Sequence, residues 1–335
     1  MDGVLIDVSR SYRDTVRQTA KLFFKGARSW EDLPDPLFQL SDLARVKQSG
    51  GLNNDWDLTC LVITLLFSHA KTPTIHEDPD NWRRYQKTIR HCDVTLLARF
   101  LQSTNRPLTT LLEKKGKLTD TFIMSLYVDD VGSGNIIKQI FQEIYLGKDL
   151  FESTYGMPPK VYNGEGSIHR EDLLFDKSLL EYLSKDNILA IATGRPKVEA
   201  DYPLDFFDLR KYFTCIYTLD DCIMEEKKIL EQEGKKVSIS KPNPYILDSI
   251  AETKKHEASG FYYIGDMPDD MEAASRSKWG FIGVGLLFSA PDKVTLKNTL
   301  LRAGADYIIE DLEELKGIIE SRKQKNRRYQ RGSNV

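Results

Sequence analysis

The sequence lacks the patterns that mark several classes of protein. Its four cysteines form no CxxC pair, which favours a reduced compartment. Its five histidines show no HxH or HxxxH spacing, so we expect no zinc site. The longest apolar run, residues 58–67, falls well short of the roughly 20 residues that span a bilayer. Asp2 and Asp7 interrupt the apolar amino end, so no signal peptide is expected either.

Charge is nearly balanced, with a formal net charge of -3. Such a balance gives no general attraction to nucleic acid or to anionic membranes. With 41% hydrophobic and 29% charged residues, the 335-residue chain is globular and long enough for two cores. We therefore predict a soluble, cytoplasmic protein of two domains, with neither nucleic acid nor membrane as a partner.

The hydrophobic pattern changes once along the chain. Residues 9–159 show helical spacing almost throughout, whereas short apolar runs and helical segments alternate from about residue 160. This change predicts a core made of residues 1–8 and 160–320, with a helical domain of residues 9–159 inserted into it. Residues 321–335 are basic and polar, which is typical of a disordered tail.

The apolar runs of the second part read as strands of a parallel sheet. Residues 188–192 form an unalternating apolar run, as a strand buried on both faces requires. Residues 260–264, 281–284 and 307–309 are similar, and helical patterns stand between them. The sequence therefore predicts an α/β fold with a doubly wound, mostly parallel sheet, whose ligand lies beyond the carboxyl ends of the strands.

Polar residues stand where phosphate chemistry would need them. Asp266 and Asp270 follow a predicted strand, and two carboxylates four residues apart can approach one Mg²⁺ ion. Thr193 and Gly194 end another strand and can offer a hydroxyl and a backbone N–H to phosphate oxygens. Lys241, before Pro242, can neutralise phosphate charge. Each motif alone is more often a turn or surface feature, and only their joint occurrence points to a site.

In their order along the chain, these motifs resemble the haloacid dehalogenase superfamily of phosphohydrolases, subfamily IA, with a large helical cap. The residues that carry the resemblance are Asp2-Gly3, Thr193-Gly194-Arg195-Pro196, Lys241-Pro242 and Gly265-Asp266 with Asp269-Asp270. The resemblance implies Mg²⁺-dependent hydrolysis of small phosphomonoesters through an aspartyl-phosphate. It also implies that Asp2 is the acid/base, that Thr193 and Lys241 bind the phosphoryl group, and that the Asp2 carbonyl joins Asp266 and Asp270 on Mg²⁺.

The opening motif departs from the family pattern, which is Asp-x-Asp-Gly. Asp2 aligns with the second Asp, so the nucleophilic Asp would stand one position before Met1. Asp7 cannot replace this nucleophile, because it lies beyond the Gly turn. Asp2 cannot be the nucleophile either, because Val4 would then stand at the position of the acid/base, and valine transfers no proton. In the family, the residues before the Asp-Gly pair form a strand at the centre of the sheet. Without that strand, backbone groups of the neighbouring strands would be left unsatisfied, at a cost of about 1–3 kcal/mol each. We therefore expect the native chain to begin upstream, and the chain as given to be inactive.

Several alternatives remain open at this point. Asn54 is a candidate substrate contact if Gly50-Gly51 acts as a hinge, or else a helix cap. Arg195 either braces the cap or substrate or forms a structural ion pair. Arg13 and Arg17 either meet an anionic group or are solvated or salt-bridged. The expected partner is a small phosphorylated metabolite, and a homodimer is left open. The alternatives to a phosphatase are a sugar phosphomutase and a non-catalytic phosphate- or metal-binding pseudoenzyme.

Overall fold

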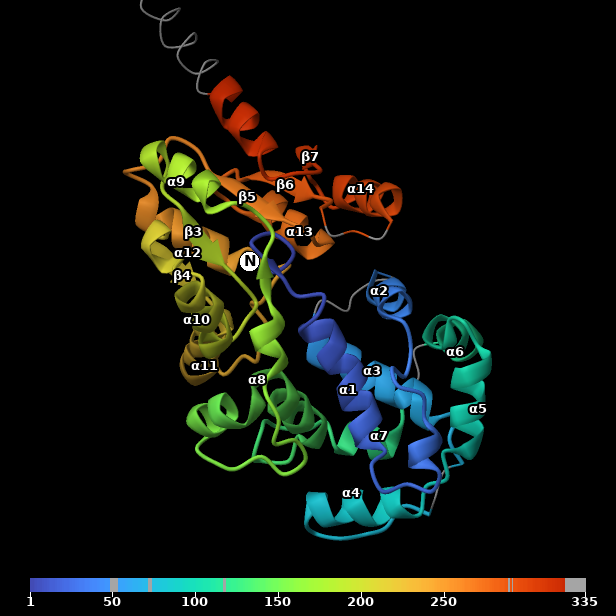
Figure 1. The fold of residues 1–335 in the computed structure, drawn as a ribbon. Helices are drawn as coiled ribbons and strands as arrows, with labels where there is room; N and C mark the ends of the chain where they lie inside the picture. The colour runs from blue at the N-terminus through green and yellow to red at the C-terminus, as the bar shows by residue number, and fades with distance from the viewer. Residues whose placement is uncertain (49–53, 72–73, 117–118, 289, 291, 323–335) are drawn as a thin grey trace, which may run out of the picture. The chain divides into compact units, whose positions relative to one another are not determined.

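The chain divides into two compact units in a computed structural model (Figure 1). One unit contains Met1–Asp7 and Asp172–Val335, and the other contains Val8–Glu171. The structure describes residues 1–48, 54–71, 74–116, 119–288, 290 and 292–322. The predicted hinge at Gly50 and Gly51 and nearly all of the predicted tail lie outside the described residues.

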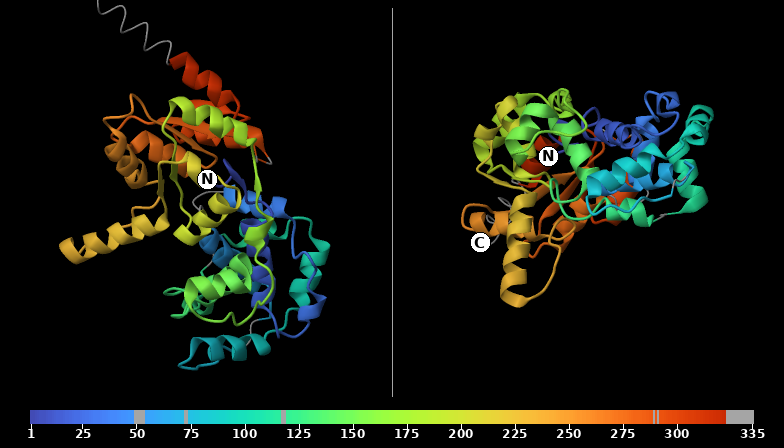
Figure 2. Two further views of the ribbon diagram at one scale, coloured as in Figure 1. Left: turned by 60° about the vertical axis from the view of Figure 1, so that its left-hand side comes forward. Right: turned by 90° about the horizontal axis from the view of Figure 1, so that it is seen from below.

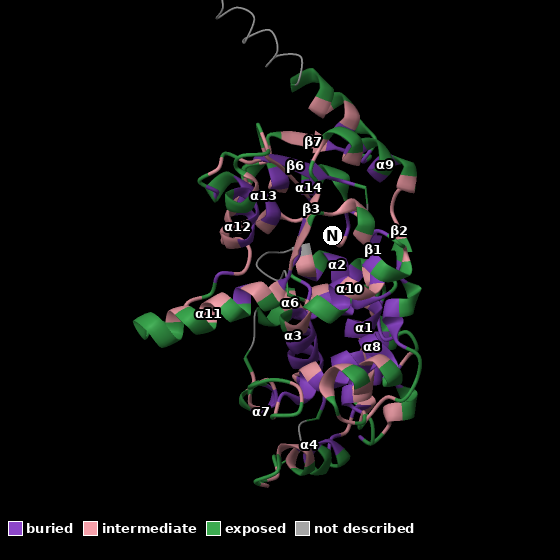
Figure 3. Ribbon diagram, turned by 90° about the vertical axis from the view of Figure 1, so that its left-hand side faces the viewer, coloured by how far each residue is buried: buried purple, intermediate pink, exposed green. Residues whose placement is uncertain are grey.

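The unit Val8–Glu171 is helical, as its hydrophobic spacing predicts. Its helices are α1 (Tyr12–Phe23), α2 (Leu40–Gln48), α3 (Asp55–Phe67), α4 (Asn81–Arg90), α5 (Thr95–Ser103), α6 (Pro107–Lys115), α7 (Thr121–Ser125) and α8 (Ile136–Tyr155). Helices α1, α3 and α8 contact one another and carry many of the buried residues of this unit (Figure 3). Across the described ranges, no helix has both the length and the apolar character that a membrane crossing needs.

Residues 160–171 pack with the helical unit, although the sequence assigned them to the α/β core. The carboxylate of Glu143 on α8 is fully buried and accepts three successive backbone N–H groups. These belong to Lys160 at 2.8 Å, Val161 at 2.7 Å and Tyr162 at 3.1 Å. At the end of the segment, Glu171 accepts the hydroxyl groups of Ser11 and Tyr145. Hydrogen bonds therefore hold this segment to the helical unit, and the hydrophobic periodicity of the sequence does not indicate them.

The other unit has the predicted α/β architecture. Its strands are β1 (Ile6–Asp7), β2 (Asp172–Leu173), β3 (Ala190–Ala192), β4 (Cys215–Tyr217), β5 (Tyr262–Gly265), β6 (Ile282–Leu286) and β7 (Tyr307–Ile309). Its helices are α9 (Lys177–Asp186), α10 (Lys197–Phe206), α11 (Leu219–Glu233), α12 (Tyr245–Lys254), α13 (Pro268–Arg276) and α14 (Lys293–Arg302), and residues 314–322 are also helical. Helix α11, which the sequence analysis did not predict, extends away from the strands of its unit (Figure 2).

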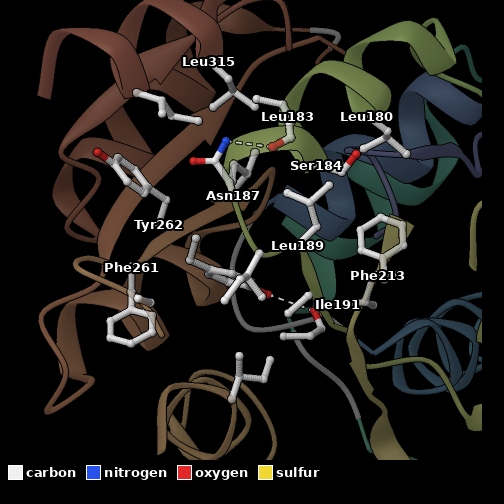
Figure 4. A pocket seen from close by; sticks show the side chains of 18 of the residues that line it. Leu180, Leu183, Ser184, Asn187, Leu189, Ile191, Phe213, Phe261, Tyr262 and Leu315 are labelled. Carbon is white, nitrogen blue, oxygen red and sulfur yellow. Dashed lines mark hydrogen bonds between the residues drawn. The ribbon is translucent and has the colours of Figure 1, made fainter. Parts of the chain in front are cut away.

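The parallel strands form two hydrogen-bonded groups in the described chain. Strand β3 pairs with β4, while β6 lies between β5 and β7. Strand β5 has apolar neighbours on both of its faces, as a parallel sheet between helices requires. Tyr262 and Ile264 of β5 pack toward Leu179 and Leu183 of α9, beside a cavity of about 670 Å³ (Figure 4), and Tyr263 packs toward the cluster that contains α12. This two-sided burial explains the unalternating apolar runs in the sequence.

The amino end is a tight turn, and the backbone becomes a strand only at β1. The N–H of Gly3 donates to the carbonyl of Ile6 at 2.9 Å, and that of Leu5 donates to the carbonyl of Met1 at 2.8 Å. Gly3 has a φ of 63°, in the left-handed region that favours glycine. Strand β1 then pairs antiparallel with β2.

Replacement of Glu143 by Gln should destabilise the helical unit. The amide would present a donor to backbone donors in a buried place, so we expect a loss of about 2 kcal/mol or more in the free energy of unfolding. Urea denaturation followed by tryptophan fluorescence measures this loss. The matched control is Glu231→Gln on the exposed part of α11, which should change little. Equal effects of the two substitutions would contradict the structural role of Glu143.

Candidate active site

The candidate residues of the α/β unit stand at strand ends and in one loop. Thr193 follows β3, which ends at Ala192, and Asp266 follows β5, which ends at Gly265. Lys241 lies in the loop before α12. The carboxyl ends of parallel strands meet at one edge of a sheet, so this placement brings the side chains toward a common region.

Lys241 and Asp270 form a buried ion pair. The Lys241 Nζ lies 2.6 Å from Asp270 Oδ1, and the two side chains are 15% and 6% exposed. The hydroxyl of Tyr263 lies 3.2 Å from the same Nζ and 3.1 Å from the same oxygen. The other oxygen of Asp270 accepts the backbone N–H of Met267 at 3.2 Å. Asp270 therefore fixes the ammonium of Lys241 and the start of α13 together.

The pair shifts the pKa values of its members in opposite directions. Burial alone would raise the pKa of Asp270, but the ammonium of Lys241 and its hydrogen bond outweigh burial and lower it. Burial alone would lower the pKa of Lys241, but Asp270 and Tyr263 hold it well above its ordinary value of 10.5. Burial, followed by the charge of Asp270, raises the pKa of Tyr263. At neutral pH the pair is therefore fully charged.

A second group joins the amino end to the end of β3. Arg195 is almost completely buried, and its Nε donates to Asp2 Oδ1 at 2.6 Å. Its Nη1 donates to the carbonyl of Glu199 at 2.9 Å, and its backbone N–H donates to Thr193 Oγ1 at 3.2 Å. Of the two interpretations left open for Arg195, the structure supports an ion pair within this unit. That pair orients the carboxylate of Asp2.

Both groups converge at the amino end of the chain. A Cβ atom on Gly3 would lie 2.1 Å from Asp266 Oδ2, so only glycine lets the backbone pass this carboxylate. The amino group of Met1 is buried among Asp2, Lys241, Asp270 and Asp266. Burial is the main cause of its lowered pKa, and the charges of these four residues act on it as well. Residues as far apart in sequence as Met1 and Asp270, 269 positions, thus lie in one place.

Comparison with known proteins agrees with this arrangement. The model of the haloacid dehalogenase-like hydrolase family matches residues 176–284, a segment that contains Thr193, Lys241, Asp266 and Asp270. A solved target of the Northeast Structural Genomics Consortium has the same fold, with a TM-score of 0.62 and 21% identity over 96% of this chain and 97% of that chain. Residues 176–284 thus match the haloacid dehalogenase-like hydrolase family. The matching family is one of hydrolases.

Two further solved structures are similar at a lower level. The phosphatase Tt82 from Thermococcus thioreducens has a TM-score of 0.48 and 20% identity over 90% of this chain and 96% of that chain. A hydrolase from Pseudomonas syringae has a TM-score of 0.45 and 20% identity over 95% of both chains. No curated protein sequence matches the chain.

The oxygen donors at this point are of the kind that suits the Mg²⁺ ion implied by the superfamily resemblance. Asp266 and Asp2 offer hard oxygen ligands at the convergence point, which suit Mg²⁺. Asp270, which was also predicted as a ligand, accepts hydrogen bonds at both of its oxygens, and its coordination of Mg²⁺ stays a prediction. Within the described residues, no three His, Cys, Asp or Glu side chains group closely enough to hold a metal by themselves. Waters and the Asp2 carbonyl would therefore complete the shell.

The remaining predicted residues have plain local roles in the structure. Asn54 caps α3, because its Oδ1 accepts the backbone N–H of Trp56 at 2.8 Å. Its contact with a substrate stays a prediction. Arg17 pairs with Asp14 on α1 and also donates to the carbonyl of Phe38, which favours the salt-bridged alternative. Gly194 is exposed, with open space where a Cβ atom would stand.

Sequence reasoning did not select Tyr263 as a site residue. Its hydroxyl lies within 3.2 Å of Lys241, Asp270 and the carbonyl of Ala192. The available signal was its place two residues before Gly265 in a buried strand, where a hydroxyl needs a partner. Two adjacent tyrosines point to opposite faces, and the sequence does not say which of them reaches the site.

A double-mutant cycle should reveal strong coupling between Lys241 and Asp270. Lys241→Met or Asp270→Asn alone leaves a buried charge without its partner, at a cost of about 3–5 kcal/mol. The double substitution should cost clearly less than the sum of the two, as measured by urea denaturation. The matched control is the exposed pair Lys228 and Glu225, whose atoms are 3.1 Å apart and whose coupling should be near zero. Additive effects at Lys241 and Asp270 would contradict the ion pair.

Proposed function

We propose that this protein is a Mg²⁺-dependent phosphatase that hydrolyses small phosphomonoesters through an aspartyl-phosphate. The observation that carries the proposal is the convergence of Asp2, Asp266 and the Lys241–Asp270 pair at one point of the α/β unit. Phosphoryl transfer requires a positioned acid/base, cationic groups around the phosphoryl oxygens and oxygen ligands for a metal. All three kinds of group are present there.

Two groups would bind the phosphoryl oxygens. Lys241 remains protonated because Asp270 and Tyr263 hold its pKa high, so it would supply a fixed positive charge. Thr193 is held by the N–H of Arg195, and its hydroxyl and the N–H of Gly194 would add neutral donors. Asp266 and the carbonyl of Asp2 would hold Mg²⁺, with Asp270 as an outer neighbour. When bound, the ion would offset charge on the transferred group.

Asp2 would serve as the acid/base. In a version of the chain with an Asp directly ahead of Met1, the carboxylate of that Asp would attack phosphorus in the first half-reaction while Asp2 gives its proton to the departing alkoxide oxygen. In the second, Asp2 takes a proton from the water that attacks the aspartyl-phosphate, which releases inorganic phosphate. The ion pair with Arg195 holds the Asp2 carboxyl in one orientation through both steps.

Phosphatase activity should depend on Asp2 and Asp266. The test uses a version of the chain with an apolar segment and an Asp placed directly ahead of Met1, together with an aryl phosphate and Mg²⁺. We expect turnover that falls by about 100-fold or more with Asp2→Asn, because general acid–base catalysis is worth about 10² to 10⁴. Asp266→Asn or removal of divalent ions with EDTA should have a comparable effect.

The matched control is Asp269→Asn, a neighbouring carboxylate in the same turn that the proposal leaves without a catalytic role. It should retain most of the activity. Binding of phosphate without turnover in the extended version would refute the phosphatase and favour a phosphate-binding module. Transfer of the phosphoryl group between two sugar hydroxyls, with little release of phosphate, would favour a phosphomutase.

A further inference from the structure

We propose that helix α11 is the interaction surface for a second copy of this chain, through an antiparallel pairing of the two α11 helices about a two-fold axis. Three features of α11 support this pairing. The helix is covered by little of its own unit, it carries an apolar stripe on the side that faces solvent, and the charges beside this stripe complement those of a second copy. None of these features belongs to the candidate active site.

The first feature is the small buried part of α11. The structure describes all 15 residues of the helix, Leu219–Glu233, and only Cys222 among them is buried. The thiol of Cys222 donates to the carbonyl of Ile239 at 3.8 Å, and Glu226 accepts the N–H of Ile239 at 2.8 Å. The helix otherwise extends away from its unit (Figure 2). Isolated helices of about 12–15 residues are only marginally stable in water, so a partner that covers α11 would stabilise it.

The second feature is an apolar stripe made of Leu219, Ile223 and Leu230. Successive residues of an α-helix are about 100° apart around its axis, so these three residues lie within about 40° of one another. Their spacings of four and seven residues are those of the seam between two paired helices. Ile223 and Leu230 are 40% and 49% exposed, and Leu219 is half-buried. A second helix laid along the stripe would remove these side chains from water.

The third feature is the pair of charges along one edge of the stripe. Asp220 and Lys227 lie on this edge, about 20° apart around the helix axis. The N–H of Lys197 donates to Asp220 Oδ2 at 2.7 Å and holds the carboxylate in place. In an antiparallel pair with two-fold symmetry, the same edge of both helices meets, so Asp220 of each copy can face Lys227 of the other. A parallel pair would bring Lys227 opposite Cys222 instead, without an ion pair.

The apolar residues fit the same register. When Asp220 lies opposite Lys227 of the second copy, the two-fold axis passes between positions 223 and 224. Ile223 then packs against Ile223 of the second copy, and Leu230 lies beside Leu219. One arrangement thus covers the apolar stripe and forms two identical ion pairs. A single pair of helices buries less than the roughly 1,200–2,000 Å² of a stable interface, so we expect a weak dimer.

Single cysteines and a short bismaleimide cross-linker test the position of the axis. Ile223→Cys places a thiol of each copy beside the axis, and we expect a severalfold higher yield of covalent dimer than with the control Met224→Cys. Met224 is the better control because it is more exposed, at 54%, yet it lies about 100° further around the helix. The unmodified chain gives the background from its own cysteines. Equal yields for the two variants would overturn the pairing, because random collisions follow exposure.

Charge reversal tests the ion pairs in dilution series measured by sedimentation velocity. Lys227→Glu should raise the dissociation constant of the dimer by about tenfold or more, because it places like charges opposite each other twice. Asp220→Lys combined with Lys227→Glu should restore association. The matched control is Lys228→Glu, which makes the same change of charge on another side of α11 and should have little effect. Far-UV circular dichroism checks that each variant keeps its helices.

Two further results would overturn the proposal. A chain that stays monomeric at every concentration would show that a second copy does not cover the stripe, which would leave it to a different protein. Equal weakening by Lys227→Glu and Lys228→Glu would show that association depends on overall charge and not on this pairing. Neither measurement requires catalytic turnover, so a failure here is distinct from a failure of the phosphatase proposal.

Discussion

The buried ion pair between Lys241 and Asp270 is the constraint on which the site depends. A charged pair inside a protein is stable only if its remaining hydrogen-bonding capacity is also satisfied. Tyr263 and the N–H of Met267 meet that condition. The pair thereby ties three segments together: the loop before α12, strand β5 and the first turn of α13. Since Asp266 stands between β5 and α13, its position follows from the same contacts.

The amino end is held to this arrangement from the other side. Arg195 links Asp2 to the loop after β3, and Gly3 allows its backbone to lie against Asp266. Neither contact involves apolar burial, so packing alone would not place the acid/base near the phosphate-binding groups. The apolar clusters on the two faces of the strands supply the stability of the unit. The polar contacts determine where the chemistry can occur.

Much of this organisation could be predicted from the sequence. The unalternating run at residues 188–192 indicated a buried parallel strand, and the helical spacing of residues 9–159 indicated the inserted helices, because both follow from the periodicity of burial. The positions of Thr193 and Asp266 at the ends of strands, and of Lys241 before a helix, could also be predicted from the sequence.

Other features could not be predicted, because they depend on partners far away in sequence. The hydrogen bonds between Glu143 and residues 160–162 attach this segment to the helical unit, so the observed domain boundary differs from the predicted one. No pattern of apolar residues indicates these hydrogen bonds. The choice of Tyr263 over Tyr262 as the partner of Lys241 depends on which face of β5 meets α12. The sequence likewise does not show that both oxygens of Asp270 accept hydrogen bonds, because the donors are known only from the fold.

The most direct measurement is an NMR titration of the Lys241 side chain in isotopically labelled protein. The account predicts that its ε-ammonium stays protonated to a pH above the ordinary lysine value of 10.5, because Asp270 stabilises the charged form. Asp270→Asn provides the assignment control, since it should lower this pKa. A Lys241 signal that titrates at or below 10.5 in the unmodified chain would contradict the account, because the ammonium would then lack the carboxylate that the structure assigns to it.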